Sequence, residues 1–119
     1  MLIKNQTRNT IIAKNPVWLS TFFGHARGLM LKPSITPHVL AFKSECHTSI
    51  HTCFVAGPID IIFVSKNNRI CELKKQLFPF SFYAPEHPAK YIIELPEKTI
   101  VKTRSRVGDV IRVHSTHHT

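Results

Sequence analysis

The chain has 119 residues and a mass of 13.6 kDa, with a formal net charge of +9 and a pI of about 9.9. This length suits a single domain over residues 1–119, and no apolar run reaches the roughly 20 residues that cross a bilayer. The first residues lack the apolar centre of a signal peptide, so we expect a cytoplasmic protein, and three cysteines without a CxxC pair argue against a disulfide framework or a zinc knuckle.

Most of the chain reads as short strands. Eight prolines, four glycines and many β-branched residues favour strands over helices. One short helix is expected near the N-terminus, where Ser20 is a suitable N-cap and the apolar residues after it follow helical spacing as far as Gly28 or Leu29. The expected strands are 10–14, 17–19, 38–42, 49–54, 59–64, 69–74, 89–95 and 110–114.

The clearest hairpin is the stretch IDIIFVSKNNRICELKK. Its loop, Ser65 to Asn68, contains adjacent asparagines, which tolerate the left-handed backbone of a tight turn. The strand before the loop, residues 59–64, is almost entirely apolar. We therefore expect this strand to be covered on both faces.

Three phenylalanines alternate in the stretch FPFSF: Phe78, Phe80 and Phe82. In an extended chain they would lie on one side. The pattern favours rings that close one end of the core, and the alternative is an aromatic platform for a base or a sugar.

Five short stretches follow one another in the order RGLML, SIHT, GPIDIIFV, AKYIIELP and VGDVI. Together they resemble the uncharacterised bacterial and archaeal family known as domain of unknown function 192, in its SIHT-containing branch, over residues 27–113. The polar residues 114–119 are expected to be a frayed tail. The resemblance implies a mostly antiparallel, barrel-like or jelly-roll-like β sandwich with one short N-terminal helix, and it implies no function.

One departure from the family pattern affects the backbone. A small glycine is usual after the ELP motif, whereas this chain has Lys98 in ELPEKT. The turn must therefore use another conformation or place a non-glycine residue in the left-handed region, at some energetic cost.

Polar side chains flank or interrupt the apolar runs of SIHTCFVAGPIDIIFV and YIIELP. They are Ser49, His51, Thr52, Asp60 and Glu94. The functional interpretation places all five at the rim of a pocket, whereas the structural alternative is that Asp60 caps backbone amides and Glu94 meets a basic residue. Arg27 is expected either to anchor the helix end or to pair with one of these acids.

The only local concentration of positive charge lies between Lys98 and Arg112. Within it, Lys102, Arg104 and Arg106 are candidate contacts for an anionic ligand or a nucleic acid, and the alternative is a solvated basic face.

The sequence therefore predicts a non-enzymatic binding or accessory module with a polar pocket rim. One alternative is a hydrolase-like enzyme that uses His51, Asp60 and Glu94, and another is a nucleic-acid-associated protein that uses the basic stretch. His51 and Cys53 are only two metal ligands, which do not make a site, so no metal and no cofactor are expected.

Overall fold

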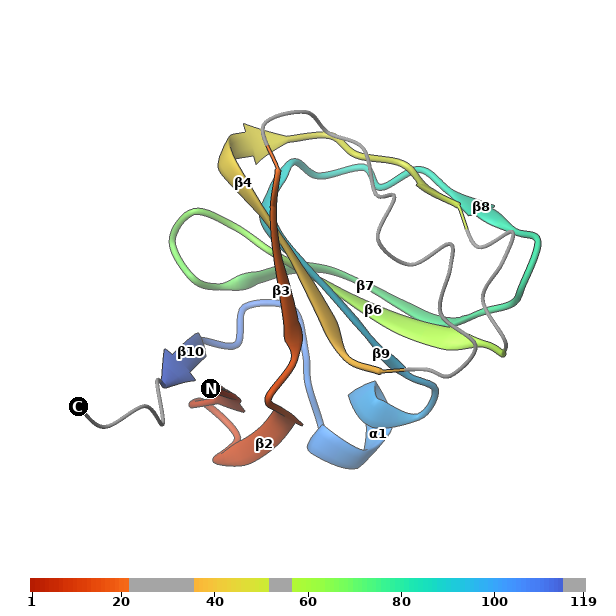
Figure 1. Cartoon of the computed structure of the whole chain (residues 1–119). Coiled ribbons are helices and arrows are strands. Elements are labelled where there is room, and N and C mark those ends of the chain that lie inside the picture. The colour runs from red at the N-terminus through yellow and green to blue at the C-terminus, as the bar shows by residue number, and fades with distance from the viewer. Residues whose placement is uncertain (22–35, 52–56, 115–119) are drawn as a thin grey trace.

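The structure is a computed structural model that describes residues 1–21, 36–51 and 57–114. This part of the chain forms ten strands and one short helix (Figure 1). The elements are β1 (Leu2–Asn5), β2 (Thr10–Lys14), β3 (Val17–Thr21), β4 (His38–Cys46), β5 (Ile50–His51), β6 (Ile59–Val64), β7 (Ile70–Leu77), β8 (Phe82–Tyr83), β9 (Ala89–Pro96), α1 (Thr99–Thr103) and β10 (Ile111–His114). The expectation of a mostly β fold is confirmed.

The strands form three sheets. The largest has the order β3-β4-β9-β6-β7, a second has the order β10-β1-β2, and β5 and β8 form a two-stranded ladder. Only the pairing of β3 with β4 is parallel among the described strands. The expected mostly antiparallel arrangement is therefore confirmed.

Each face of the five-stranded sheet packs against its own apolar cluster. The first face, with Ile62, Val64 and Ile93, packs against Ile3 of β1 and Ile100 of α1. The second face carries another cluster. That cluster contains Leu40, Phe42, Ile50, Ile59, Ile61, Phe63, Leu77, Ala89 and Ile92. Every residue of β6 is buried because this strand contributes to both clusters, as its apolar sequence predicts.

Two finer expectations about the architecture are wrong. The five-stranded sheet ends at β3 on one edge and at β7 on the other, so within the described residues the sheets do not close into a barrel. The only helix of that part of the chain is α1, near the C-terminus, and Ser20 lies in strand β3 instead of capping a helix. The rest of the expected N-terminal helix, with Arg27, lies outside the described residues.

The helix α1 escaped the sequence analysis because it is only five residues long. Two of its five residues are β-branched, apolar Ile100 and Val101, whose propensity favours strands. Its backbone starts from Lys98, which has φ 72°, and ends at Arg104, which has φ 56°. A left-handed residue at each end is what confines the helix to a little more than one turn. No helix in the described ranges is long and apolar enough to cross a membrane.

The predicted β6–β7 hairpin is confirmed, whereas the prediction that the FPFSF stretch closes the core is wrong. β6 and β7 pair antiparallel, and Asn68 in their turn has φ 62°, both as predicted. Phe78, Phe80 and Phe82 do not close the core, because their side chains are 58%, 80% and 57% exposed.

Candidate functional site

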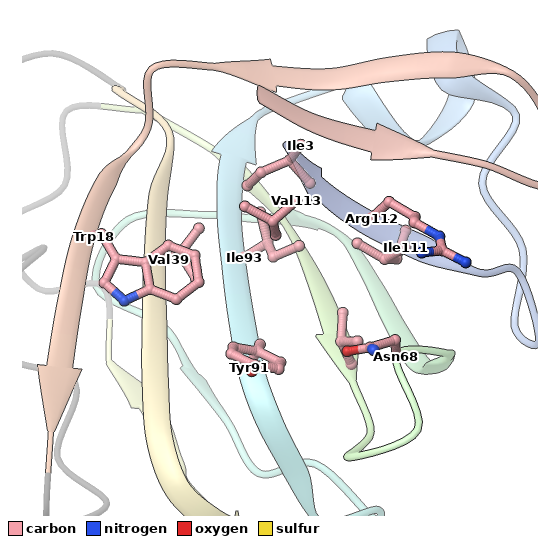
Figure 2. Close-up of a pocket in the computed structure, with 10 residues that line it drawn as sticks. Ile3, Trp18, Val39, Asn68, Tyr91, Ile93, Ile111, Arg112 and Val113 are labelled. Carbon is pink, nitrogen blue, oxygen red and sulfur yellow. The ribbon is translucent and has the colours of Figure 1, made fainter. Parts of the chain in front are cut away.

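A hollow of about 260 Å³ lies between the three-stranded and the five-stranded sheets (Figure 2). It lies on the first face of the larger sheet, between residues of β1 and β10 on one side and residues of β4, β6 and β9 on the other. The residues that line it are Ile3, Trp18, Val39, Val64, Asn68, Tyr91, Ile93, Ile111, Arg112 and Val113. Its volume is near the lower limit for ligand pockets, which suits a small molecule.

Two aromatic side chains form one wall of this hollow. The ring centroids of Trp18 on β3 and Tyr91 on β9 are 5.9 Å apart, with an angle of 57° between the ring planes. Both rings pack against the core cluster of the first face but remain partly exposed. Trp18 is on an edge strand, so no further strand covers its outer side among the described residues.

The same aromatic pair borders a second hollow of about 210 Å³, on the side of β3 and β4. There the Lys90 ammonium lies 5.6 Å from the centroid of the Tyr91 ring. Lys90 Nζ also donates hydrogen bonds to the backbone carbonyls of Phe42 and Lys43, at 3.0 and 3.1 Å. These contacts hold the Lys90 side chain beside the Tyr91 ring, on the side of the ring that faces the second hollow.

Two polar side chains lie on the opposite side of the first hollow. Asn68, in the β6–β7 turn, extends its carboxamide toward Tyr91 in Figure 2. Its backbone carbonyl accepts a hydrogen bond from Ile111 N at 2.8 Å, which joins this turn to β10. Arg112 lies at the edge, where its Nε donates to the side-chain oxygen of Gln6. The hollow therefore combines an apolar floor, an aromatic wall and a small number of hydrogen-bonding groups.

Asp60 is an anchor for the backbone. It is 1% exposed, and its two carboxylate oxygens accept hydrogen bonds from two different segments. Oδ2 accepts from Ile100 N in α1 at 2.9 Å, and Oδ1 accepts from Gln76 N in β7 at 3.0 Å. Gln76 has φ 51°, at an irregular position near the end of β7. This is the capping role that the sequence analysis kept as the structural alternative.

Glu94 is in a very different environment. It is 1% exposed, and neither of its carboxylate oxygens has a hydrogen-bond partner among the described residues. Burial raises the pKa of Glu94 to about 8, so its carboxyl group is mostly protonated at neutral pH. The register of β4 and β9 places Glu94 directly opposite His38, and that of β6 and β9 places it opposite Ile61. His38 Nδ1 is 2.5 Å from the carbonyl oxygen of Thr36.

The remaining candidates of the polar rim fall elsewhere. Ser49 is partly buried just before β5, and His51 is the last residue of β5, paired with Phe82 of β8. Thr52 and Cys53 lie outside the described residues. Within the described chain, no hydrogen bond joins Ser49, Asp60 or Glu94 to one another. No three histidine, cysteine, aspartate or glutamate side chains of the described ranges could share a metal ion.

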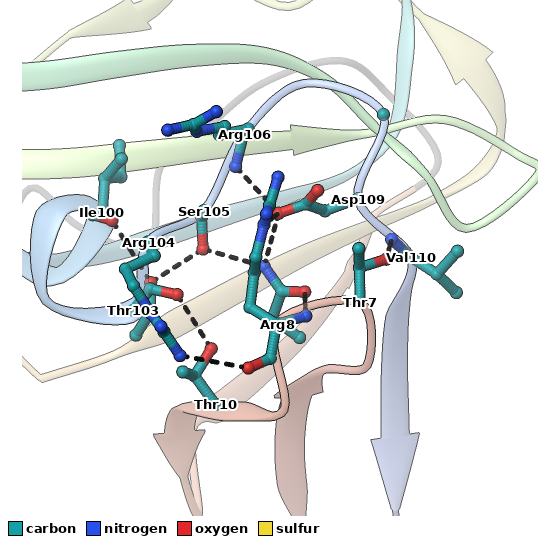
Figure 3. Close-up of polar contacts among 12 residues, drawn as sticks. Thr7, Arg8, Thr10, Ile100, Thr103, Arg104, Ser105, Arg106, Asp109 and Val110 are labelled. Carbon is teal, nitrogen blue, oxygen red and sulfur yellow. Dashed lines mark hydrogen bonds and ion pairs between the residues drawn. The ribbon is translucent and has the colours of Figure 1, made fainter.

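Two of the candidate basic residues, Arg104 and Arg106, lie beside a cluster of buried polar residues that includes Thr103, Ser105 and Asp109 (Figure 3). Lys102, Arg104 and Arg106 are exposed, and Arg104 Nη2 donates to the backbone carbonyl of Arg8 at 3.3 Å. Arg8 Nε in turn lies 3.1 Å from Asp109 Oδ2. The structure therefore adds Arg8, on the β1–β2 turn, to the basic residues that the sequence singled out.

Asp109, of the VGDVI stretch, holds this region together. Its Oδ2 accepts hydrogen bonds from Asn5 Nδ2 at 2.9 Å and from Arg106 N at 2.9 Å, in addition to Arg8. Burial by itself would raise the pKa of Asp109, but the hydrogen bonds from Asn5, Arg8 and Arg106 outweigh it and lower this pKa. Asn5 also donates to Ser105 Oγ at 3.1 Å. Asp109 Oδ2 therefore joins β1, the β1–β2 turn and the loop before β10.

The hollow could not be predicted from the sequence. Its lining residues come from seven separate segments: β1, β3, β4, β6, β9, β10 and the β6–β7 turn. A local sequence motif cannot indicate that segments so far apart in the chain lie together. One signal was present: Trp18 is the single tryptophan of the chain, and it lies on a short strand directly after Pro16. A large aromatic ring on an edge strand is a common feature of binding surfaces.

The chain is similar to proteins without an assigned role. Residues 5–113 match the model of the family DUF192, described as an uncharacterized ACR. The chain is 35% identical over 114 residues to a UPF0127 protein of Thermococcus sibiricus, covering 93% of this chain and 73% of that protein. It is 34% identical over 107 residues to a UPF0127 protein of Pyrococcus furiosus, covering 88% of this chain and 91% of that protein.

Two solved structures share the fold. A protein of unknown function from Novosphingobium aromaticivorans superposes with a TM-score of 0.78 at 14% identity, over 94% of this chain and 82% of that chain. A protein of Sinorhizobium meliloti, described as a candidate transcription regulator, superposes with a TM-score of 0.66 at 19% identity, over 71% of this chain and 70% of that chain. At these identities the likeness shows the fold alone.

Proposed function

We propose, from the premise that this chain belongs to the uncharacterised DUF192 family, that it is a non-enzymatic binding module for a small, mainly apolar molecule. The binding site is the hollow between the two larger sheets. Its ligand carries one hydrogen-bonding group that meets Asn68 and an apolar body that lies against Trp18 and Tyr91. The module is a single domain, as its length suits.

The composition of the lining is the observation that carries this proposal. None of the ten lining residues is a carboxylate, a histidine, a cysteine or a serine. Apart from the Tyr91 hydroxyl, the described lining therefore offers none of the side chains that most often act as a nucleophile or as a general acid–base group. An apolar surface with a few polar groups for orientation is what a binding site needs.

The hydrolase-like alternative has less support. It requires Asp60 and Glu94 to share one site with His51, whereas both oxygens of Asp60 already accept backbone hydrogen bonds. Asp60 and Glu94 also point to different faces of the sheet, as the two core clusters around them show. A catalytic pair of carboxylates needs both side chains on the same substrate.

Tryptophan fluorescence tests the binding proposal directly because Trp18 is the single tryptophan of the chain. We expect a saturable change in its emission on titration with 1-octanol and with octanamide, which do not absorb in this range. Val113→Phe places a ring in the hollow and should weaken both affinities roughly tenfold. Asn68→Gly keeps the positive φ of the turn, removes the carboxamide, and should weaken octanamide more than 1-octanol.

Val107→Phe is the matched control, because Val107 is an exposed valine outside the hollow. It should leave both titrations unchanged. Emission that does not respond to either probe would contradict the proposal. Equal losses in Val107→Phe and Val113→Phe would also contradict it, because the effect would then not depend on the hollow.

A nucleic-acid-associated role is the second candidate, because four basic residues lie on the β1–β2 turn, on α1 and in the segment after α1. Their side chains offer positive charge to phosphates: Arg8, Lys102, Arg104 and Arg106. This role predicts binding of a fluorescein-labelled DNA duplex that weakens steeply with salt, and a shallower salt dependence for Arg104→Gln with Arg106→Gln. Binding that is insensitive to salt would contradict it.

A further inference from the structure

The FPFSF stretch forms an exposed aromatic loop, defined here as residues 78–82. It connects β7 to β8 and lies at the end of the molecule away from β10 and the N-terminus (Figure 1). Phe78, Phe80 and Phe82 are 58%, 80% and 57% exposed. Three large apolar side chains within five residues make a concentrated apolar surface, unlike the single exposed apolar residues that are normal on soluble proteins.

The backbone of the aromatic loop is held in an unfavourable conformation. Phe80 has φ 60°, a left-handed conformation that is rare for bulky residues. Such strain persists only where the surrounding structure enforces it, and it is concentrated at functional positions. Here it presents the most exposed phenylalanine of the three to the solvent.

Glu72, on β7, fixes the segment that follows the aromatic loop. Its Oε1 accepts hydrogen bonds from the backbone amides of Glu86 and His87, at 2.9 and 3.0 Å, and from His87 Nδ1 at 2.9 Å. Its Oε2 accepts from the Tyr83 hydroxyl. A single buried carboxylate thus joins β7, β8 and the turn before β9, so the aromatic loop is supported by a rigid base.

Positive charge borders the aromatic loop. Lys74 Nζ lies 5.6 Å from the centroid of the Tyr83 ring, next to Phe82 in the chain. Lys75 lines a small hollow that it shares with Lys98 at the start of α1. Four acids lie in the same region: Asp60, Glu72 and Glu97 accept hydrogen bonds, the last from Gln76 Nε2 at 3.3 Å, and Glu86 is exposed.

From these observations we infer that the aromatic loop inserts into the surface of an anionic phospholipid bilayer, with Lys74, Lys75 and Lys98 on the headgroups. The tip of this loop exposes three phenylalanine rings, which provide apolar area without a hydrogen-bonding group. A fluid bilayer accepts such a tip, whereas protein interfaces favour tyrosine, tryptophan and arginine. The lysines and the net charge of +9 complement anionic lipid.

Vesicle sedimentation of the full chain tests this inference. We expect more protein to pellet with phosphatidylcholine vesicles that contain phosphatidylglycerol than with phosphatidylcholine alone. Phe80→Ser should lower partitioning roughly tenfold, because it removes the insertion of one phenylalanine. Phe80→Leu should retain most of it. Lys74→Gln with Lys75→Gln should lower partitioning on the anionic vesicles roughly fivefold for each lysine lost.

Val107→Ser is the matched control, since Val107 is 62% exposed and lies on the loop before β10. It should leave partitioning unchanged, and thermal unfolding should show that every variant is folded. Equal sedimentation of the wild-type chain and Phe80→Ser would overturn the inference, and so would equal sedimentation on the two kinds of vesicle. Light scattering that shows a dimer lost in Phe80→Ser would assign the aromatic loop to a second copy of the chain instead.

Discussion

Asp60 and Glu94 lie on neighbouring strands of the five-stranded sheet, and their carboxyl groups point to opposite faces of it. In the register of β6 and β9, Asp60 is opposite Leu95 and Glu94 is opposite Ile61. Leu95 belongs to the core cluster of the first face and Ile61 to that of the second. The two acids therefore have separate roles, and each can be tested without the other.

Glu94 should make the protein less stable as the pH rises. Its pKa is raised by burial from 4.5 to about 8, so folding favours the protonated acid. A raised folded-state pKa contributes stability that is complete below pH 4.5 and is lost progressively up to about pH 8. The loss is at most roughly 1.4 kcal/mol for each pH unit in this interval.

Glu94→Gln tests this directly, because the amide has a similar shape and does not titrate. We expect this variant to gain stability relative to the wild type as the pH rises from 5 to 8, in urea unfolding followed by circular dichroism. His38→Gln is a useful companion, since His38 is the titratable residue that faces Glu94 from β4. Parallel pH profiles for the wild type and Glu94→Gln would show that Glu94 is ionised in the folded protein.

Asp60→Ala should destabilise the protein and loosen α1. The variant leaves the amides of Ile100 and Gln76 without their acceptor, which costs about 3 kcal/mol if each lost hydrogen bond to the charged group is worth about 1.5 kcal/mol. Urea unfolding measures the total loss. Relative to the wild type, the variant should show a larger increase in the hydrogen-exchange rate at the Ile100 amide than at the Ile93 amide, which lies in the central strand β9. An unchanged rate at Ile100 would show that Asp60 does not anchor the helix.

The protein should lose stability at acid pH because the carboxylates of Asp109 and Glu72 become protonated there. The pKa of each is lowered in spite of burial, because hydrogen bonds to the carboxylates outweigh it. A lowered folded-state pKa contributes stability that is present above the ordinary value, 3.8 for Asp109 and 4.5 for Glu72, and is lost as the pH falls through the lower value. Together with Glu94, these groups predict maximal stability near pH 4.5 to 5.

Asp109→Asn should reduce the loss of stability below pH 4, at a cost of about 1–3 kcal/mol at neutral pH from the weakened contacts with Asn5, Arg8 and Arg106. Thermal unfolding between pH 2.5 and 7 measures both effects. The control is Glu45→Gln, which removes the negative charge of a carboxylate that accepts a hydrogen bond from the Lys66 amide. If the wild type and Asp109→Asn lose the same stability between pH 4 and pH 2.5, the proposed role of Asp109 is contradicted.

Strand positions could be predicted because they depend on local pattern. Residues 10–14 and 59–64 match β2 and β6 to the residue, and the paired asparagines correctly marked a left-handed turn at Asn68. The parallel pairing of β3 with β4 depends on contacts between distant segments, which no local pattern contains. The hollow beside Trp18 also depends on contacts between distant segments, so no local pattern could predict it.

The candidate site was harder to predict than the fold. Asp60 and Glu94 both interrupt apolar strands, and the sequence pattern of the two is nearly identical. They differ only in what faces them: backbone amides of α1 and β7 reach Asp60, whereas Glu94 faces His38 and Ile61. Burial of a polar residue can be read from the sequence, but its partner requires the three-dimensional arrangement.

The departure at Lys98 leads to a last prediction. The structure confirms that the turn keeps the left-handed backbone, since Lys98 has φ 72° and its side chain makes no capping hydrogen bond. Lys98→Gly should therefore stabilise the protein by about 0.5–1 kcal/mol, because glycine adopts this conformation without steric cost. Lys102→Gly is the matched control: this exposed lysine has a helical backbone, and the same substitution there should destabilise by about 1 kcal/mol. If the strain lies at Lys98, urea unfolding should give changes in the free energy of unfolding of opposite sign for the two variants. If it does not, both variants should be less stable than the wild type.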